Sequence, residues 1–417
     1  MSFFAHRDQT VQFAAQPDFD YEIRCIIGAA HEGAAVIGEV LAATASIRPH
    51  DHARWYEVWR ELAERSSRSA AKTHQEGGLA SAADAYLRAS AYFGVAVNAL
   101  SALDRPGDLL RTFRAQRAAW QAFVACVDVE SEHARIAIDS GEVAGWLFRS
   151  PANAATEKRH TLVVVNGSDG SLASVWASAA APALRRGLDV LVFDGPGQQS
   201  DLFERGGRFR PDWEHVLTPI YDWLAAKEDR DPSRVALMGI SQGGHWVARA
   251  LAFEHRFAAA VLDPGVVDVA ASWEQHIPRS LLAAFERGDD DRFDQEIAIG
   301  MKFSPTTART WSFRARPYGT QGYAATLRAV RQYSVADVAA QIRTPMLIAS
   351  PEGEQFWPGQ SERLAALAPS VSTLLPFTAE EGAGGHCEPL ARPLFAERAF
   401  SWLDEQLAQA GSGVNAR

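Results

Sequence analysis

The chain has 417 residues, of which 47% are hydrophobic and 22% are charged, the composition of an ordinary globular protein with room for more than one structural unit. Its formal net charge of -10 argues against a nucleic-acid partner, because binding to phosphates needs a basic surface, and favours a small-molecule substrate. Three cysteines far apart in the chain argue against a disulfide framework. The sequence contains no apolar run of about 18 residues, the length needed to span a membrane.

Two further features favour a cytoplasmic location. The N-terminal sequence MSFFAHRDQTVQF lacks the basic segment and the following apolar run of a secretory signal. An odd number of unclustered cysteines fits a reducing compartment. We therefore expect a cytoplasmic protein with no membrane partner.

Helical periodicity dominates the first part of the chain, from about residue 17 to 128. Apolar residues recur at helical spacing, and no segment in this part is a convincing strand. The intervening breaks, IRPHD, QEGGL and LDRPGD, carry the Pro, Gly and Asp residues typical of helix ends. The pattern predicts four or five helices, which form a helical unit over residues 1–130.

Short apolar and β-branched runs replace this pattern from about residue 131. Several are apolar throughout, as strands covered by helices on both faces must be, and they alternate with helical segments, which predicts a mostly parallel sheet. The eight runs are EHARIAI, GEVAGWLF, HTLVVV, DVLVFD, RVALMGI, AAVLD, PMLIAS and STLLPF. They predict a core whose first part covers residues 131–265 and whose second part covers residues 341–417.

One stretch interrupts the alternation of strands and helices. Between Asp263 and Thr344 lie about eighty residues rich in helix formers and aromatic side chains. This stretch is too long for a connecting loop. We therefore expect residues 266–340 to form a helical lid inserted into the core.

The segment SRVALMGISQGGHWVARALAF predicts a strand, a sharp turn and a helix, with Gly239, Ser241 and Gly243 at the turn. A serine in this position projects from the edge of the sheet, and the flanking glycines avoid a collision with the neighbouring strand or helix. A Gly-x-Ser-x-Gly sequence also arises by chance, but here it directly follows a buried strand and begins a helix. Ser241 is therefore the candidate nucleophile.

An acyl-transfer serine needs N–H donors for the oxyanion, one from the residue after the nucleophile and one from the loop after an earlier strand. Gln242 supplies the first. The strand HTLVVV ends in the glycine-rich turn NGSDG, and we assign the second donor to Ser168, with Gly167 as its neighbour. The alternative for this turn is an ordinary connection between a strand and a helix.

The candidate base is His386, in the loop EEGAGGHCEPL between the last predicted strand and the C-terminal helix. In catalytic triads of this chain order, the histidine that takes the proton of the serine comes from such a loop. His245 lies just after the turn that carries Ser241, and it is a candidate packing or pocket residue.

Three carboxyl groups are candidates for the acid that orients His386. Glu352 and Glu354 lie in the loop after the seventh strand, and Asp263 ends the sixth strand. A carboxylate in either place can fix the histidine tautomer and stabilise its positive charge. Glu354 is favoured because it stands four residues before Pro358, but the sequence leaves the choice open, and each of the three can also be a solvated loop carboxylate.

These motifs together resemble the α/β-hydrolases grouped with 2,6-dihydroxypseudooxynicotine hydrolase, the FrsA-like proteins and the fungal heptaketide hydrolases. The resemblance covers nearly the whole chain, and it is carried by RWYEVWRELAER, DAYLRASAYF, GISQGG, PEGEQFWPGQS and GGHCEP. It implies an α/β-hydrolase fold in which the N-terminal helical unit and the lid together cover the active site. In this family the helical unit often also takes part in dimerisation. We therefore expect a homodimer.

The resemblance also implies hydrolysis of a carbon–carbon bond beside a carbonyl, or of an ester or amide, with Ser241 as nucleophile and His386 as base. The chain departs from the family at the acid, because its loop offers only glutamates where the family commonly has aspartate. An extra pocket carboxylate assists carbon–carbon cleavage in the pseudooxynicotine hydrolases. Asp263 or Glu274 is the candidate for that part here.

Two other functions are compatible with the same residues. Capture of the acyl-enzyme by an amine or alcohol would make the protein an acyltransferase or cyclase, and a hydrolase scaffold can also serve as a non-catalytic binding protein. The sequence has no Walker loop, HExxH motif or Cys/His cluster, and the glycines of DGPGQQ lack the GxGxxG spacing. We therefore expect no nucleotide or metal cofactor.

Overall fold

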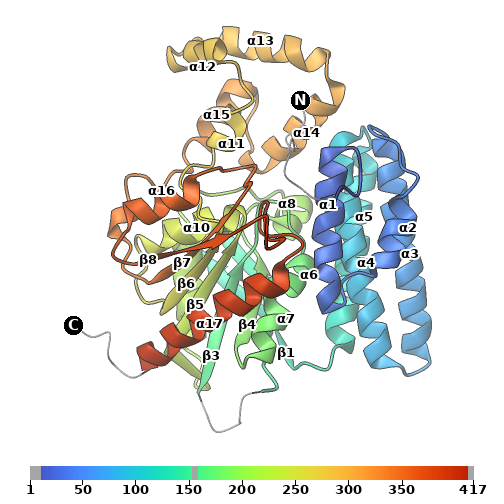
Figure 1. Ribbon diagram of the computed structural model, residues 1–417, viewed down its shortest axis with the longest axis vertical. Helices are drawn as coiled ribbons and strands as arrows, with labels where there is room; N and C mark the ends of the chain where they lie inside the picture. The colour runs from blue at the N-terminus through green and yellow to red at the C-terminus, as the bar shows by residue number, and fades with distance from the viewer. Residues whose placement is uncertain (1–10, 153–157, 412–417) are drawn as a thin grey trace.

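The computed structural model of the chain describes residues 11–152 and 158–411 (Figure 1). The first ten residues, which make up most of the N-terminal sequence discussed above, lie outside the described residues. No helix in the described ranges is long and apolar enough to cross a membrane.

The part of the chain before the first strand is helical, as its periodicity predicts, and its described residues form five α-helices. Three of them begin at residues that favour a helix start, because the Asp51 side chain accepts the N–H of Arg54 at 3.0 Å and two other helices have a proline, Pro17 or Pro106, as their first residue. The helices are α1 (Pro17–Gly28), α2 (Ile37–Thr44), α3 (His52–Gln75), α4 (Leu79–Ala99) and α5 (Pro106–Cys126), with the short 3-10 helices η1 (Ala29–Glu32) and η2 (Leu100–Ala102).

Each of the eight predicted runs forms a strand, and the described strands make one sheet in the order β1-β2-β4-β3-β5-β6-β7-β8. The pairs β1–β2 and β2–β4 are antiparallel, and all other neighbours are parallel. The strands are β1 (Ser131–Ile138), β2 (Gly141–Phe148), β3 (Arg159–Val165), β4 (Asp189–Asp194), β5 (Arg230–Ile240), β6 (Ala259–Asp263), β7 (Met346–Pro351) and β8 (Ser372–Phe377). The prediction of a mostly parallel, eight-stranded sheet is confirmed.

Helices cover both faces of the sheet, so its central strands are buried on both sides. In β4, Val190 and Val192 face a core shared with α1–α5, whereas Leu191 and Phe193 face a second core on the opposite side. The first core also includes α6 (Leu172–Val175), η3 (Trp176–Ala180), α7 (Ala181–Arg185) and α17 (Arg392–Gly411), and the second includes α9 (Glu214–Ala225), α10 (Gln242–Leu251) and α16 (Gln360–Leu367). The N-terminal helices are therefore packed onto the sheet, not appended to it.

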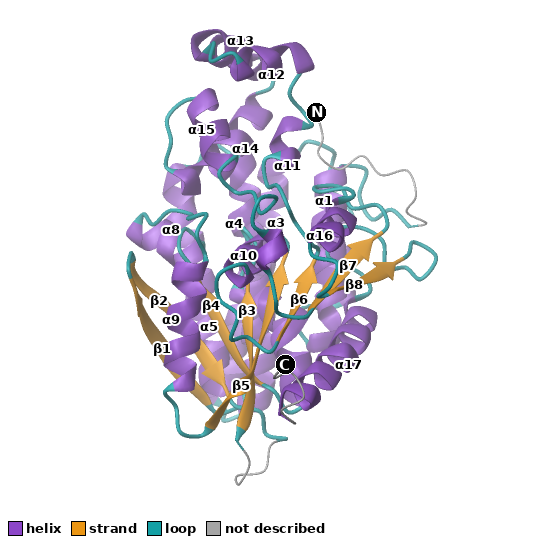
Figure 2. Ribbon diagram, turned by 90° about the vertical axis from the view of Figure 1, so that its left-hand side faces the viewer, coloured by secondary structure: helices purple, strands orange, loops and turns teal. Residues whose placement is uncertain are grey.

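The stretch expected to form a lid is helical and stands above the ends of the parallel strands (Figure 2). Its outer part has a small core of its own that includes Phe285, Phe293 and Leu327. Its helices are α11 (Ala271–Glu274), α12 (Arg279–Glu286), α13 (Asp290–Lys302), α14 (Pro305–Ala315), η4 (Arg316–Tyr318) and α15 (Tyr323–Val330). Among the described residues, the remaining short helices are α8 (Gln199–Arg205) and η5 (Ala339–Gln341).

Candidate active site

The sharp turn predicted at Ser241 lies between β5, which ends at Ile240, and α10, which begins at Gln242. Ser241 has φ 56° and ψ −127°, a left-handed conformation that a side chain of this kind rarely adopts. Its N–H donates to the carbonyl oxygen of Asp263 at the end of the neighbouring strand, at 2.6 Å. The strained turn presents the hydroxyl at the carboxyl edge of the sheet.

Glycines allow this turn to approach its neighbours. A Cβ on Gly239 would lie 2.4 Å from the carbonyl oxygen of Gly243, and one on Gly243 would lie 2.4 Å from the carbonyl oxygen of Val165 in β3. Both distances are far below van der Waals contact with backbone atoms that cannot move aside. The glycines of the motif are therefore required by packing, as the sequence pattern predicts.

Three side chains from separate loops form a continuous hydrogen-bonded chain. His386 Nε2 lies 2.8 Å from Ser241 Oγ, and His386 Nδ1 lies 2.8 Å from Glu354 Oε2. The side chains of His386 and Glu354 are only 4% and 7% exposed, so water screens this contact weakly. A serine, an imidazole and a carboxyl in this order can move a proton from the hydroxyl to the ring.

The Glu354 carboxyl is held in its charged form by its surroundings. Burial by itself raises its pKa, but the His386 ring and the N–H groups of Phe356 and Trp357 together bring the pKa below its ordinary value. These N–H groups donate to Glu354 Oε1 at 2.8 and 3.2 Å. One carboxyl oxygen is thus fixed by its own loop and the other faces the imidazole.

The other two candidate acids are engaged elsewhere. The Glu352 side chain is exposed and accepts the N–H of Ala379 at 2.8 Å. The fully buried Asp263 carboxyl accepts from Arg392 at 2.6 Å. Neither makes a hydrogen bond to His386 within the described residues, and Asp263 is paired with Arg392 instead, so the geometry favours Glu354 among the three candidate acids.

Asp263 instead belongs to a buried cluster beneath the active site. Arg392 also donates to the carbonyl oxygen of Cys387 at 2.8 Å and to Glu388 Oε2 at 3.3 Å. Burial raises the pKa of Glu388 well above its usual range, and the neighbouring Asp263 raises it further, so a protonated Glu388 can share its hydrogen with Asp263. Because Asp263 is the last residue of β6 and Cys387 follows His386, the cluster connects the histidine loop to the sheet.

We expect Arg392→Met to lower the free energy of unfolding by about 3–5 kcal/mol, because it leaves two buried carboxyls without their cation. Arg398→Met is the matched control, since Arg398 pairs with Glu381 at the surface, and it should change stability little. Urea denaturation of both variants measures the difference. Equal stability of the two would contradict the role given to the cluster.

The predicted oxyanion loop follows β3 and is held by side chains that the sequence did not single out. Gly167 donates its N–H to Asn166 Oδ1 at 2.8 Å, and Gln198 Nε2 donates to the carbonyl oxygens of Asn166 and Gly167 at 2.9 and 2.7 Å. Gly167 therefore serves as a spacer, because a Cβ there would lie 2.9 Å from Ser241 Cβ. The N–H groups of Ser168 and Gln242 are the candidate donors.

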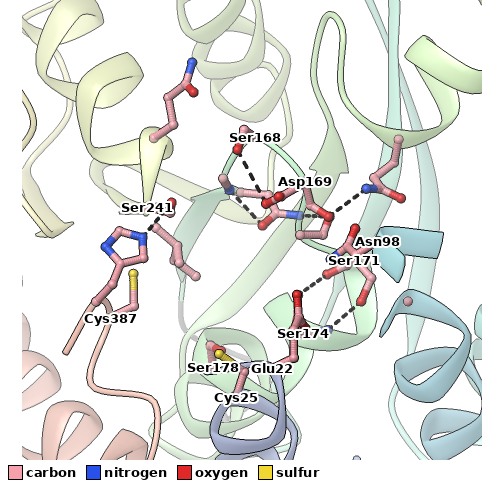
Figure 3. Close-up of a pocket in the computed structure, with 18 of the residues that line it drawn as sticks. Glu22, Cys25, Asn98, Ser168, Asp169, Ser171, Ser174, Ser178, Ser241 and Cys387 are labelled. Carbon is pink, nitrogen blue, oxygen red and sulfur yellow. Dashed lines mark hydrogen bonds between the residues drawn. The ribbon is translucent and has the colours of Figure 1, made fainter. Parts of the chain in front are cut away.

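A cavity of about 290 Å³ is lined by Ser241 and His386, and Figure 3 shows Ser241 within it. Its lining combines the sheet edge with two other parts of the chain. The N-terminal helices contribute Tyr21, Glu22, Cys25 and Asn98, and the lid contributes Trp273, Phe313, Arg314 and Tyr318. Sequence reasoning missed the N-terminal lining residues, although polar side chains such as Glu22 and Asn98 among apolar helical neighbours were a signal for them.

The two further pocket candidates, His245 and Glu274, do not lie among the residues that line the cavity. Of the two alternatives predicted for His245, packing or a place in the pocket, the structure favours packing. His245 is fully buried, its Nδ1 lies 3.3 Å from the carbonyl oxygen of Val266, and burial lowers its pKa to about 3. It is thus a neutral packing residue. Glu274 accepts from Arg331 at 2.5 Å within the lid.

Known proteins are similar to the chain over most of its length. The Alpha/beta hydrolase family matches residues 162–398. Hydrolase LUC6 from Fusarium sp is 29% identical over 93% of this chain and 96% of its own length, and 20-hydroxy-prefusarin hydrolase FUS2 from Gibberella moniliformis is 25% identical over 94% and 96%. The crystal structure of the 2,6-dihydroxy-pseudo-oxynicotine hydrolase has a TM-score of 0.70 at 18% identity, over 91% of this chain and 95% of that one. The similarity extends over the helical part and the sheet alike.

Proposed function

This chain belongs to the alpha/beta hydrolase family and has its fold, and we propose that, as a hydrolase of this family, it acts on a small molecule through Ser241, His386 and Glu354. The observation that carries the proposal is the hydrogen-bonded chain of these three side chains at one end of a cavity. Relatives named as hydrolases over more than nine-tenths of the chain support the same activity.

The proposed first step forms one bond and moves one proton. Ser241 Oγ attacks a carbonyl carbon while its proton passes to His386 Nε2, and Glu354 stabilises the imidazolium. The N–H groups of Gln242 and Ser168 stabilise the oxyanion. When the intermediate collapses, the bond to the leaving group breaks and His386 returns the proton to that group. Water then attacks the acyl-enzyme by the same route and releases an acid.

We propose that the scissile bond is a carbon–carbon bond beside a carbonyl, an ester bond or an amide bond. In each case the leaving group, a stabilised carbanion, an alcohol or an amine, takes the proton that His386 holds. The lining of the cavity includes aromatic side chains such as Phe209, Trp273 and Phe313, and these suit a small organic substrate. Assay of the purified protein against β-diketones, aryl esters and acyl amides tests the three bond types directly.

Acyl transfer or cyclisation is the alternative fate of the same acyl-enzyme, with an amine or alcohol in place of water. Product analysis separates the two, because hydrolysis releases a free acid and transfer forms a new ester, amide or ring. Labelled oxygen from water appears in the product only after hydrolysis. We also propose that the protein is a homodimer and that it is located in the cytoplasm. Light scattering of the purified chain tests whether it is a homodimer.

A fluorophosphonate probe should label Ser241, because a hydroxyl activated by His386 is far more nucleophilic than a serine at the surface. Mass spectrometry of the labelled peptide identifies the site. Ser241→Ala should abolish labelling, whereas the exposed Ser401→Ala control should not change it. Labelling at full strength in Ser241→Ala would refute the assignment.

A further inference from the structure

The N-terminal helices bring two polar side chains to the cavity that the hydrolytic mechanism does not use. Glu22 lies on α1 and Asn98 lies near the end of α4, and both line the cavity that contains Ser241 (Figure 3). The side chain of Asn98 hydrogen-bonds the Glu22 carboxyl. The pair therefore joins two helices at a wall of the cavity outside the proposed triad.

The surroundings of Glu22 favour its protonated form. Burial raises the pKa of this carboxyl to about 8, the Asp169 and Asp18 carboxyls also raise it, and the Asn98 hydrogen bond and Arg314 oppose the rise. The Cys25 thiol on the same helix stays neutral, because burial and Glu22 raise its pKa. Below this pKa the Glu22 carboxyl carries a proton and can donate a hydrogen bond into the cavity.

The rest of the lining indicates what such a donor would bind. Aromatic side chains of the lid, including Trp273 and Phe313, suit an apolar body. Arg314 and Asp169 also line the cavity, and because their charges are opposite, this part of the wall favours neither a cation nor an anion beside the neutral carboxyl. An apolar molecule with an uncharged oxygen group fits both the aromatic lining and the hydrogen-bond donor at Glu22.

We propose that Glu22, held in place by Asn98, is a specificity-determining residue that donates a hydrogen bond to a carbonyl or hydroxyl oxygen of the substrate at a point separate from the bond that Ser241 attacks. The inference rests on the proposed function for the reacting end of the substrate. Binding is measured without turnover, so a failure of hydrolysis and a failure of this inference give different results.

The test compares two ligands of matched size by isothermal titration calorimetry on the full chain. 1,4-Diacetylbenzene carries two carbonyls, one for the oxyanion donors and one for Glu22, whereas 4-ethylacetophenone replaces the second carbonyl with a methylene. Neither ligand titrates near neutral pH. At pH 6.5 we expect the diketone to bind about 3- to 10-fold more tightly, the factor that one added hydrogen bond contributes.

Substitutions at Glu22 should change the ratio of the affinities for the diketone and for 4-ethylacetophenone, according to the hydrogen-bond donor that the new side chain provides. Glu22→Leu has no donor, so the ratio should fall to about 1, while Glu22→Gln keeps an N–H donor and should retain the preference within about threefold. Glu76→Leu is the matched control, because Glu76 is exposed at the end of α3. An unchanged ratio in Glu22→Leu would overturn the proposal.

The pH series tests the protonation state and does not depend on the leucine variant folding. Because only the protonated carboxyl donates, the preference of the wild-type chain should disappear as the pH rises from 6.5 to 9.5, through the pKa of about 8, while Glu22→Gln keeps it. A wild-type preference that persists at pH 9.5 would contradict the proposal. A second result would also contradict the proposal. If 4-acetylbenzylamine bound more tightly than the diketone at pH 6.5, and this preference were lost in Glu22→Gln, Glu22 would be a carboxylate that binds a cation.

Discussion

Glu354→Gln is expected to lower kcat for ester hydrolysis by roughly 10²- to 10⁴-fold with little change in KM. The glutamine keeps the shape of the side chain, but its amide can donate to His386 Nδ1, which now lies 2.8 Å from a carboxyl oxygen. Such a contact favours the tautomer with the proton on Nε2, which cannot accept the proton of Ser241. Steady-state kinetics with p-nitrophenyl acetate measure the effect.

Two matched variants make this result specific to Glu354. Glu352→Gln changes a carboxyl two residues earlier in the same loop, whose side chain contacts Ala379, and it should leave kcat nearly unchanged. Asp263→Asn alters the buried cluster, and ester hydrolysis by the folded protein should survive. If Asp263→Asn abolished ester hydrolysis and Glu354→Gln left it intact, the acid would come from β6 and the assignment of Glu354 would be wrong.

Deletion of residues 1–125 is expected to yield insoluble or inactive protein, because these helices share a core with one face of the sheet. Phe123 packs on Trp176 with ring centroids 4.8 Å apart, and Trp120 packs on Phe148 at 6.2 Å. Loss of a buried aromatic side chain costs about 3–5 kcal/mol in a typical core, and the deletion removes several. It would also expose a large apolar surface.

The same deletion removes support from the active site itself. A Cβ on Gly28 of α1 would lie 1.7 Å from the carbonyl oxygen of Pro389, and Tyr21 donates to the carbonyl oxygen of His386 at 3.4 Å. The loop that carries His386 therefore packs against α1. Solubility and p-nitrophenyl acetate hydrolysis of the truncated chain test the expectation, with co-expressed residues 1–130 as a rescue control. A soluble truncation with full activity would contradict it.

The sequence by itself determined the elements and the candidate nucleophile, because these depend on local order. A period of 3.6 residues marks a helix face and continuous apolar runs mark buried strands, so the helical region before residue 131 and all eight strands could be predicted. The turn at Ser241 is also recognisable from a short stretch of sequence, although of its two glycines only Gly239 is needed by the turn itself, while Gly243 leaves room for Val165 of β3. His386 followed from its place after the last strand.

Only the tertiary structure decided which carboxyl meets His386, because that choice depends on contacts between residues far apart in the chain. Asp263 ends β6 and Glu354 lies in the loop after β7, at the same edge of the sheet. The Asp263 carboxyl, however, forms an ion pair with Arg392, which lies 129 positions later in the chain. Glu22 reaches the cavity for the same reason, since α1 packs beside the His386 loop. A periodic pattern shows that a helix has a buried face, but it does not show which polar residue beside that face will line a distant active site.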